Sequence, residues 1–152
     1  MTITNSDAAP ITISQALHTY FTISDIGAIR ISGLDGATYY DKVTDTHDHR
    51  QSGDISFDGE LDRIYRHGEG EIEMSDPGLK RSVLINQTGG KSIVVWNPWI
   101  EKAGARNDMG PAASYRSMAC IETGSVADDS ITLEPGATHT LETTIAVKSH
   151  QA

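Results

Sequence analysis

Residues 11–23, ITISQALHTYFTI, alternate apolar and polar side chains along nearly their whole length. One row holds Ile11, Ile13, Leu17, Phe21 and Ile23, and the other holds Thr12, Ser14, His18, Tyr20 and Thr22. A period of two is that of a β-strand with one face in a core and the other in polar surroundings. This stretch therefore predicts strand structure, with His18 on the polar face.

The same alternation returns near the carboxyl end, where Leu141, Ile145 and Val147 share one face of an expected strand. Between the two stretches lie short turn signals: Asp58-Gly59, Asp76-Pro77-Gly78, Gly89-Gly90 and Pro135-Gly136. We therefore predict an all-β fold, an antiparallel meander closed into a β-sandwich, with residues 1–152 in a single domain. No stretch indicates a long helix, and residues 97–115 are expected to form a long irregular loop beside a site.

Composition narrows the functional classes. The chain has 152 residues and a net charge of −9, and it has no run of Lys or Arg to follow a phosphate backbone, so nucleic acid is not an expected partner. No apolar run approaches the roughly 20 residues needed to cross a bilayer, so no membrane association is expected either. The single cysteine, Cys120, and an amino terminus without the features of a secretory signal favour a cytoplasmic protein.

Three polar residues stand out from their surroundings. His18 lies on the polar face of its strand, which fits a hydrogen-bonded surface histidine at least as well as a catalytic one. Glu122 alternates with Met118 and Cys120, so its carboxylate is expected to be partly desolvated. Desolvation raises a carboxyl pKa and suits a general base, although a structural ion pair is the commoner cause of such a pattern. Asp62 follows an expected turn and is by itself only an acid at the end of a strand.

Other constellations point less clearly to chemistry. His47 and His49 flank Asp48 and would share one strand face, but no third metal ligand is evident and an exposed polar stretch is the simpler interpretation. Cys120 is expected to pack as a small apolar residue. Trp96 and Trp99 could wall a sugar site, but we assign them to the core.

Six segments in order resemble the hexose-6-phosphate mutarotase (glucose-6-phosphate 1-epimerase) family of galactose mutarotase-like proteins. They are ALHTYF (16–21), SDIGAIRISGLDGATYYDK (24–42), GELDRIY (59–65), VVWNPWIEKAGARNDMG (94–110), YRSMACIETG (115–124) and SITLEPGATHTLETTIAV (130–147). The resemblance implies the galactose mutarotase-like β-sandwich and interconversion of the α and β anomers of a hexose 6-phosphate. It assigns His18 as general acid, Glu122 as general base and Asp62 as a substrate-binding acid. It implies no metal and no cofactor.

The resemblance matches the carboxyl-terminal half of the family fold. The family's first strands, and the arginines that bind the substrate phosphate, have no counterpart in the six segments. A noncatalytic carbohydrate-binding or structural β-domain therefore stays open as the alternative to an isomerase acting on a hexose or its 6-phosphate. Apolar rows without partners and open sheet edges also predict a homo-oligomer.

Overall fold

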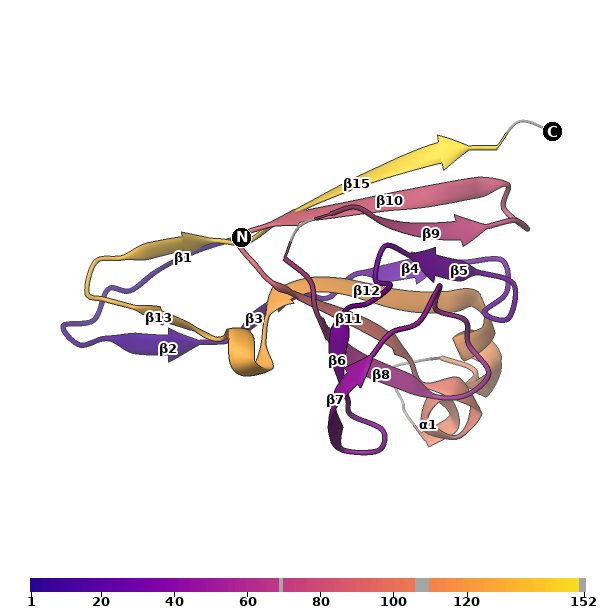
Figure 1. Ribbon diagram of the computed structural model, residues 1–152, viewed down its shortest axis with the longest axis horizontal. Helices are drawn as coiled ribbons and strands as arrows, with labels where there is room; N and C mark the ends of the chain where they lie inside the picture. The colour runs from indigo at the N-terminus through magenta and orange to yellow at the C-terminus, as the bar shows by residue number, and fades with distance from the viewer. Residues whose placement is uncertain (69, 106–109, 151–152) are drawn as a thin grey trace.

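The computed structural model describes residues 1–68, 70–105 and 110–150, and strands dominate them (Figure 1). The strands are β1 (Thr2–Thr4), β2 (Ile11–Ile13), β3 (Gln15–Leu17), β4 (Tyr20–Thr22), β5 (Arg30–Ser32), β6 (Thr38–Asp41), β7 (Thr46–Arg50), β8 (Leu61–Arg66), β9 (Ile72–Asp76), β10 (Arg81–Thr88), β11 (Ser92–Asn97), β12 (Met118–Ser125), β13 (Ile131–Leu133), β14 (Thr138–Thr140) and β15 (Glu142–Ser149). The helical segments are α1 (Trp99–Ala105) and the 3-10 turns η1 (Ala112–Ser117) and η2 (Ala127–Asp129). Within these described ranges, no helix has the length and apolar character that crossing a bilayer requires.

Two antiparallel sheets form the body of the molecule. The larger sheet has the order β3-β12-β11-β8-β6-β7, and β4 also pairs with β12. The smaller sheet has the order β15-β10-β9-β5 and lies above the larger one in Figure 1. Every strand pair is antiparallel, so the prediction of an antiparallel β-sandwich is confirmed.

The hydrophobic core lies between these sheets. The larger sheet contributes odd-numbered side chains of its central strands, and the smaller sheet contributes its own inner row to the same cluster. At most 1% of each of these side chains is exposed: Ile31, Tyr65, Ile72, Met74, Ile85, Ile93, Val95 and Ile121. Because strand side chains alternate, the even-numbered residues of β8, β11 and β12 must point to the other face of the larger sheet.

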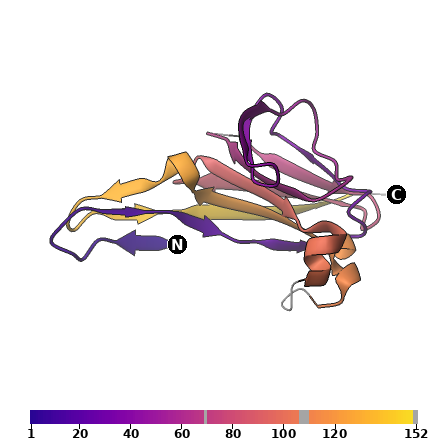
Figure 2. The same cartoon turned by 90° about the horizontal axis from the view of Figure 1, so that it is seen from below.

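Two strand pairs extend from one end of the body. β1 pairs with β14 and β2 pairs with β13, and together they form the projection on the left of Figures 1 and 2. Residues 11–23 are therefore divided between this projection and the larger sheet. Ile11 and Ile13 are only half-buried in the projection, whereas Ile23 is buried in the core. The single continuous apolar row expected from the sequence is wrong for its first part, because β2 has no second sheet above it.

The turn signals mark real turns, but only Asp76-Pro77-Gly78 closes a hairpin, between β9 and β10. Gly89-Gly90 and Pro135-Gly136 instead carry the chain between strands that do not pair with each other. Asp58-Gly59 precedes β8, and the segment before it contributes only an isolated bridge between Ile55 and Ile31. The expected simple meander is thus wrong, because a turn residue fixes a change of direction and not the partner of the next strand.

Residues 97–115 are not an irregular loop throughout. Helix α1 begins at Trp99 and η1 begins at Ala112, while residues 106–109 lie outside the described ranges. Asn97 organises this region, because its Oδ1 accepts a hydrogen bond from the Trp99 amide at 2.9 Å. Its Nδ2 donates to the carbonyl oxygens of Tyr115 and Met118, each at 2.9 Å. A helix of seven residues is too short to give a clear helical period in the sequence.

Candidate active site

The outer face of the larger sheet carries rows of side chains that cross several strands. In one row Tyr20 pairs with Cys120, Cys120 with Trp96, and Trp96 with Asp62. In the next row Glu122 pairs with Val94, and Val94 with Ile64. Directly paired residues of antiparallel strands share a face, so the strand registers alone bring Glu122 and Asp62 to the same surface.

A cavity of about 460 Å³ opens on this face. Most of its lining comes from β3, β4, β8, β11 and β12, with contributions from the segment after β6 and from α1. The residues that line it are Ala16, His18, Tyr20, Lys42, Asp62, Ile64, Val94, Trp96, Lys102, Glu122 and Val126. The volume is within the range of small-molecule sites, and the lining combines an apolar floor with a few convergent polar groups.

His18 and Glu122 are in direct contact inside this cavity. The Nε2 atom of His18 lies 3.2 Å from Oε1 of Glu122, and their side chains are 48% and 8% exposed, respectively. The His18 ring stacks on Tyr20, with ring centroids 4.6 Å apart, and meets the edge of Trp96 at 6.1 Å. One partner is thus open to solvent and the other is buried in the sheet, with two aromatic rings to orient the imidazole.

The surroundings of Glu122 favour its protonated form. Burial raises the pKa of this carboxyl to about 7, with a further raising contribution from the negative charge of Asp62 and an opposing one from Lys42. A carboxyl whose pKa lies near neutrality is populated both as acid and as base at the pH of the cell. Glu122 is therefore suited to taking up and returning a proton.

Charged groups of both signs surround the pair. Lys42 Nζ lies 3.4 Å from Oδ2 of Asp62, and Lys102 Nζ lies 2.6 Å from Oε1 of Glu60 at the edge of the cavity. The side chain of Asp62 is 13% exposed, so its carboxylate is held in place with limited access to water. A carboxylate fixed in this way can accept hydrogen bonds from the hydroxyl groups of a ligand.

The three residues singled out in the sequence thus lie together: His18, Asp62 and Glu122 all line one cavity on one face of the sheet. Trp96 was assigned to the core from the sequence, yet it lines the same cavity while only 7% exposed. Lys42 and Lys102 were missed. Trp96 lies an even number of residues from Val94, which is a signal for the outer face, but the sequence gives no signal that α1 turns Lys102 toward the site.

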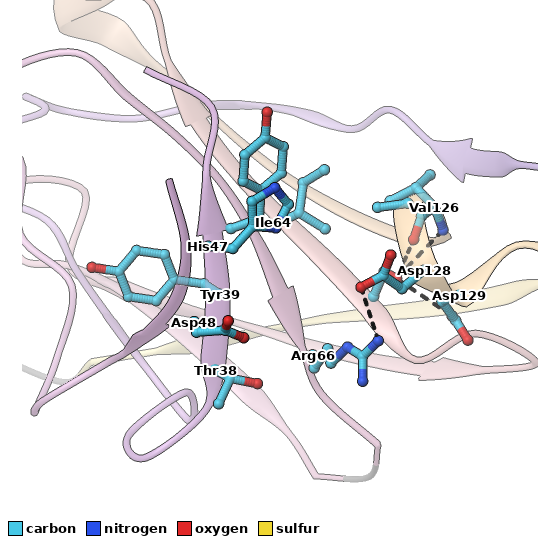
Figure 3. A pocket seen from close by; sticks show the side chains of 12 residues that line it. Thr38, Tyr39, His47, Asp48, Ile64, Arg66, Val126, Asp128 and Asp129 are labelled. Atoms are coloured by element: carbon cyan, nitrogen blue, oxygen red, sulfur yellow. Dashed lines mark hydrogen bonds and ion pairs between the residues drawn. The ribbon is translucent and has the colours of Figure 1, made fainter. Parts of the chain in front are cut away.

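A second hollow of about 180 Å³ adjoins the first and shares Ile64 and Val126 with it (Figure 3). Arg66 crosses it to form an ion pair with Asp128, at 3.1 Å between Nη2 and Oδ2, and both side chains are largely exposed. Figure 3 shows this contact beside His47 and Asp48 of β7. The hollow is more acidic than the cavity that holds His18, because Asp48, Asp128 and Asp129 line it.

The expectation that His47 and His49 share a strand face is wrong. His47 stacks on Tyr40, with ring centroids 4.0 Å apart, whereas His49 stacks on Tyr39 at 5.1 Å. Tyr39 and Tyr40 are consecutive residues of β6, so the two imidazoles lie on opposite faces of the sheet. The cause is local, because Asp48 between them has a positive φ of 62° and breaks the strand alternation. These histidines therefore do not form a joint metal site.

Within the part of the chain that the structure describes, His18, Cys120 and Glu122 form the one group of three potential metal ligands. Their ligand atoms all lie within 4.8 Å of one another. Cys120 is fully buried against Trp96 and Met118, as expected of a small apolar residue.

A model of the aldose 1-epimerase family matches residues 1–146. The chain belongs to the aldose 1-epimerase family. Among curated relatives of this family, the chain is 37% identical over 134 residues to the "Putative glucose-6-phosphate 1-epimerase" of Cenchrus ciliaris, covering 88% of this chain and 40% of that protein. It is 32% identical over 111 residues to the protein of the same name from Escherichia coli K12, covering 72% of this chain and 37% of that protein.

The fold is similar to that of solved mutarotase-like structures. The crystal structure of a "putative mutarotase" from Salmonella typhimurium superimposes with a TM-score of 0.84 at 27% identity, covering 93% of this chain and 48% of that chain. The chain thus spans about half of that structure and about two fifths of the curated relatives. The prediction of a mutarotase-like β-sandwich from this family is confirmed.

Proposed function

We propose that this chain carries the acid and base of a mutarotase that interconverts the α and β anomers of a hexose 6-phosphate. The observation that carries the proposal is the contact of 3.2 Å between His18 and Glu122 in a cavity of about 460 Å³. Membership of the aldose 1-epimerase family supports the reaction type. The names of the plant and bacterial relatives support glucose 6-phosphate as the substrate to test first.

The reaction needs one proton removed and one added at neighbouring oxygens. The Glu122 carboxylate takes the proton of the anomeric hydroxyl group, and the His18 imidazolium gives its proton to the ring oxygen. The bond between C1 and the ring oxygen then breaks, and the open-chain aldehyde forms. After rotation about the C1–C2 bond the ring closes on the other face, His18 recovers its proton and Glu122 returns the other to the new hydroxyl group.

The short distance between the two groups fits this chemistry. The anomeric oxygen and the ring oxygen are both bonded to C1, so they lie side by side in the substrate. Two catalytic groups in mutual contact can therefore reach both oxygens from one edge of the sugar. Asp62, held by Lys42, lies on the same face and would fix the sugar through its other hydroxyl groups.

The test is anomer exchange of glucose 6-phosphate measured by NMR with and without the protein, with free glucose as a parallel substrate. We expect the protein to raise the rate of anomer exchange above the spontaneous rate. The sugar with the larger increase in rate is the one that the site prefers. Glu122→Gln keeps the shape but cannot accept the proton, so the turnover should fall about 10²-fold to 10⁴-fold with little change in KM. His18→Asn should behave in the same way, and activity should persist in EDTA.

Asp128→Asn is the matched control, because it removes an exposed acid from the neighbouring hollow and leaves the cavity unchanged. Its turnover should equal that of the unmodified protein. Saturable sugar binding without exchange would contradict the proposal and favour the alternative, a noncatalytic carbohydrate-binding domain. Near-normal turnover of either active-site variant would contradict the assignment of the acid and the base.

A further inference from the structure

The row of side chains that contains Glu122 also offers sulfur and nitrogen ligands to a metal ion. Cys120 and Glu122 lie two residues apart on β12, so both side chains point to the outer face of the larger sheet. β12 is held between β11 on one side and β3 and β4 on the other, which fixes the backbone beneath both ligands. His18 approaches from the short segment between β3 and β4.

We propose that His18, Cys120 and Glu122 form a binding site for a thiophilic divalent cation such as Zn²⁺ or Cd²⁺, and that the cation inhibits the protein. The three ligand atoms lie within 4.8 Å of one another. Two ligands on one tetrahedral zinc ion lie about 3.3–3.8 Å apart when the bonds have their usual lengths, so movements of about 1 Å are enough to close the site. Because His18 and Glu122 line the cavity, water from it would fill the fourth position.

The chemistry of the three ligands selects the class of ion. Thiolate and imidazole favour zinc and softer cations, whereas magnesium and calcium prefer oxygen ligands alone. Burial raises the pKa of the Cys120 thiol, so the metal must displace this proton, which passes to the buffer as the sulfur takes a place on the metal. The negative charges of the Cys120 thiolate and the Glu122 carboxylate then balance the two positive charges of the cation. This pairing offsets the free-energy cost of burying the Glu122 carboxylate.

The position of the site determines its effect. His18 and Glu122 are the groups proposed to move protons in the reaction, and a metal bound to both occupies the lone pairs that this reaction needs. The cation is thus an inhibitor and not a cofactor. Cys120 has no part in the proposed proton transfers. It does not line the cavity, so it would bind the metal without contacting the sugar.

The test uses the tag-free full chain, freed of metal and titrated with Cd²⁺. We expect one equivalent to bind and to give the ultraviolet charge-transfer band of a cadmium thiolate. Cys120→Ser keeps the size of the side chain but removes the thiol, so the band should disappear and the affinity should fall at least about 100-fold. His18→Asn should keep the band but weaken binding, which separates the ligands from one another.

A variant with both His47→Asn and His49→Asn is the control for adventitious binding to surface histidines, and its Cd²⁺ affinity should be unchanged. Circular dichroism of each variant checks that it is folded. The absence of a thiolate band in the unmodified protein would overturn the proposal, as would equal affinity in folded Cys120→Ser. These readouts do not depend on catalysis, so they distinguish failure of the metal site from failure of the mutarotase proposal.

Where turnover is measurable, Zn²⁺ should inhibit the unmodified protein and EDTA should restore its activity. Cys120→Ser should have normal turnover without metal and should resist inhibition at Zn²⁺ concentrations that stop the unmodified protein. Equal inhibition of the two proteins would show that the thiol is not a ligand and would overturn the proposal.

Discussion

The charge of Glu122 is set first by burial and then by two neighbours of opposite sign on the same face of the sheet. Asp62 raises the pKa of the Glu122 carboxyl and Lys42 lowers it, while burial makes the largest contribution and brings the value to about 7. The carboxylate that a base requires is therefore populated increasingly as the pH rises through about 7. A mutation of either neighbour should shift this pH without altering the fold, because both side chains lie at the cavity wall.

We therefore predict that Asp62→Asn lowers the pKa of Glu122 and that Lys42→Met raises it. The sign follows from the charge removed: losing a negative neighbour makes the carboxylate easier to form, and losing a positive one makes it harder. The measurement is a titration of the carboxyl carbon of Glu122 by NMR. Asp128→Asn should leave the pKa unchanged, and a shift of the same sign in both cavity variants would contradict this account.

At the residue scale, the sequence pattern predicts the apolar surroundings of the Glu122 carboxylate. The alternation of Met118, Cys120 and Glu122 indicates a carboxylate among apolar neighbours, and the structure has that arrangement. The contact between His18 and Glu122 joins residues 104 positions apart, and no local pattern specifies such a distance; only the family resemblance pointed to the pair. Trp96 shows the limit of local reasoning, because it is buried and lines the cavity at the same time.

At the scale of elements, Gly89 and Gly90 lie in close contact with the backbone of other segments. Gly89 has a φ of +79°, and a Cβ atom there would lie 1.9 Å from the carbonyl oxygen of Thr140. A Cβ atom on Gly90 would lie 2.2 Å from the carbonyl oxygen of Gly124. The chain thus passes between two backbone segments on its way from β10 to β11, and only residues without a side chain fit.

We predict that Gly89→Ala destabilises the protein by about 3 kcal/mol or more, since the backbone at Thr140 must move. Gly136→Ala is the matched control, because its φ of +78° is nearly the same but its Cβ atom would meet nothing within 4 Å. That change should cost only the left-handed conformation, about 1 kcal/mol. Urea unfolding measures both, and equal losses would show that the close approach to Thr140 contributes nothing.

The elements themselves could be predicted only in part. Strand structure and the shared face of Met118, Cys120 and Glu122 follow from alternation, which is local and has a period of two. The partners of the strands do not, because β2, β3 and β4 lie close in sequence yet pair with β13 and with two parts of β12. Helix α1 depends on hydrogen bonds from Asn97 to residues as far away as Met118. A hydrogen bond between residues so far apart produces no periodic pattern in the sequence.

At the scale of the whole molecule, the smaller sheet has an apolar surface that its own chain does not cover. Val147 pairs with Val83, and Ile145 pairs with Ile85. Paired residues share a face, yet Val83 and Ile85 are buried while Ile145 and Val147 are 45% and 59% exposed. The core thus ends beneath β10, and β15, the outermost strand at the top of Figure 1, extends beyond it.

β15 also presents an open edge, since within the described residues it pairs only with β10. An open edge next to exposed apolar side chains favours pairing with another chain. We therefore predict that this protein self-associates at micromolar concentration, with β15 in the interface. Sedimentation velocity should show a dimer or a larger species that dissociates on dilution.

Two matched variants locate the interface. Changing both Ile145→Lys and Val147→Lys places two positive charges on the apolar face, so like charges would meet across the interface and the sedimentation coefficient should fall to that of a monomer. Ala146→Lys places one charge on the opposite face of the same strand and should leave the association in place unless that face is also covered. A compact monomer of the unmodified protein would contradict the prediction. If only Ala146→Lys abolished association, the interface would lie on the other face of β15. An apolar interface on the face of Ile145 and Val147 would not be sensitive to a charge that points away from it.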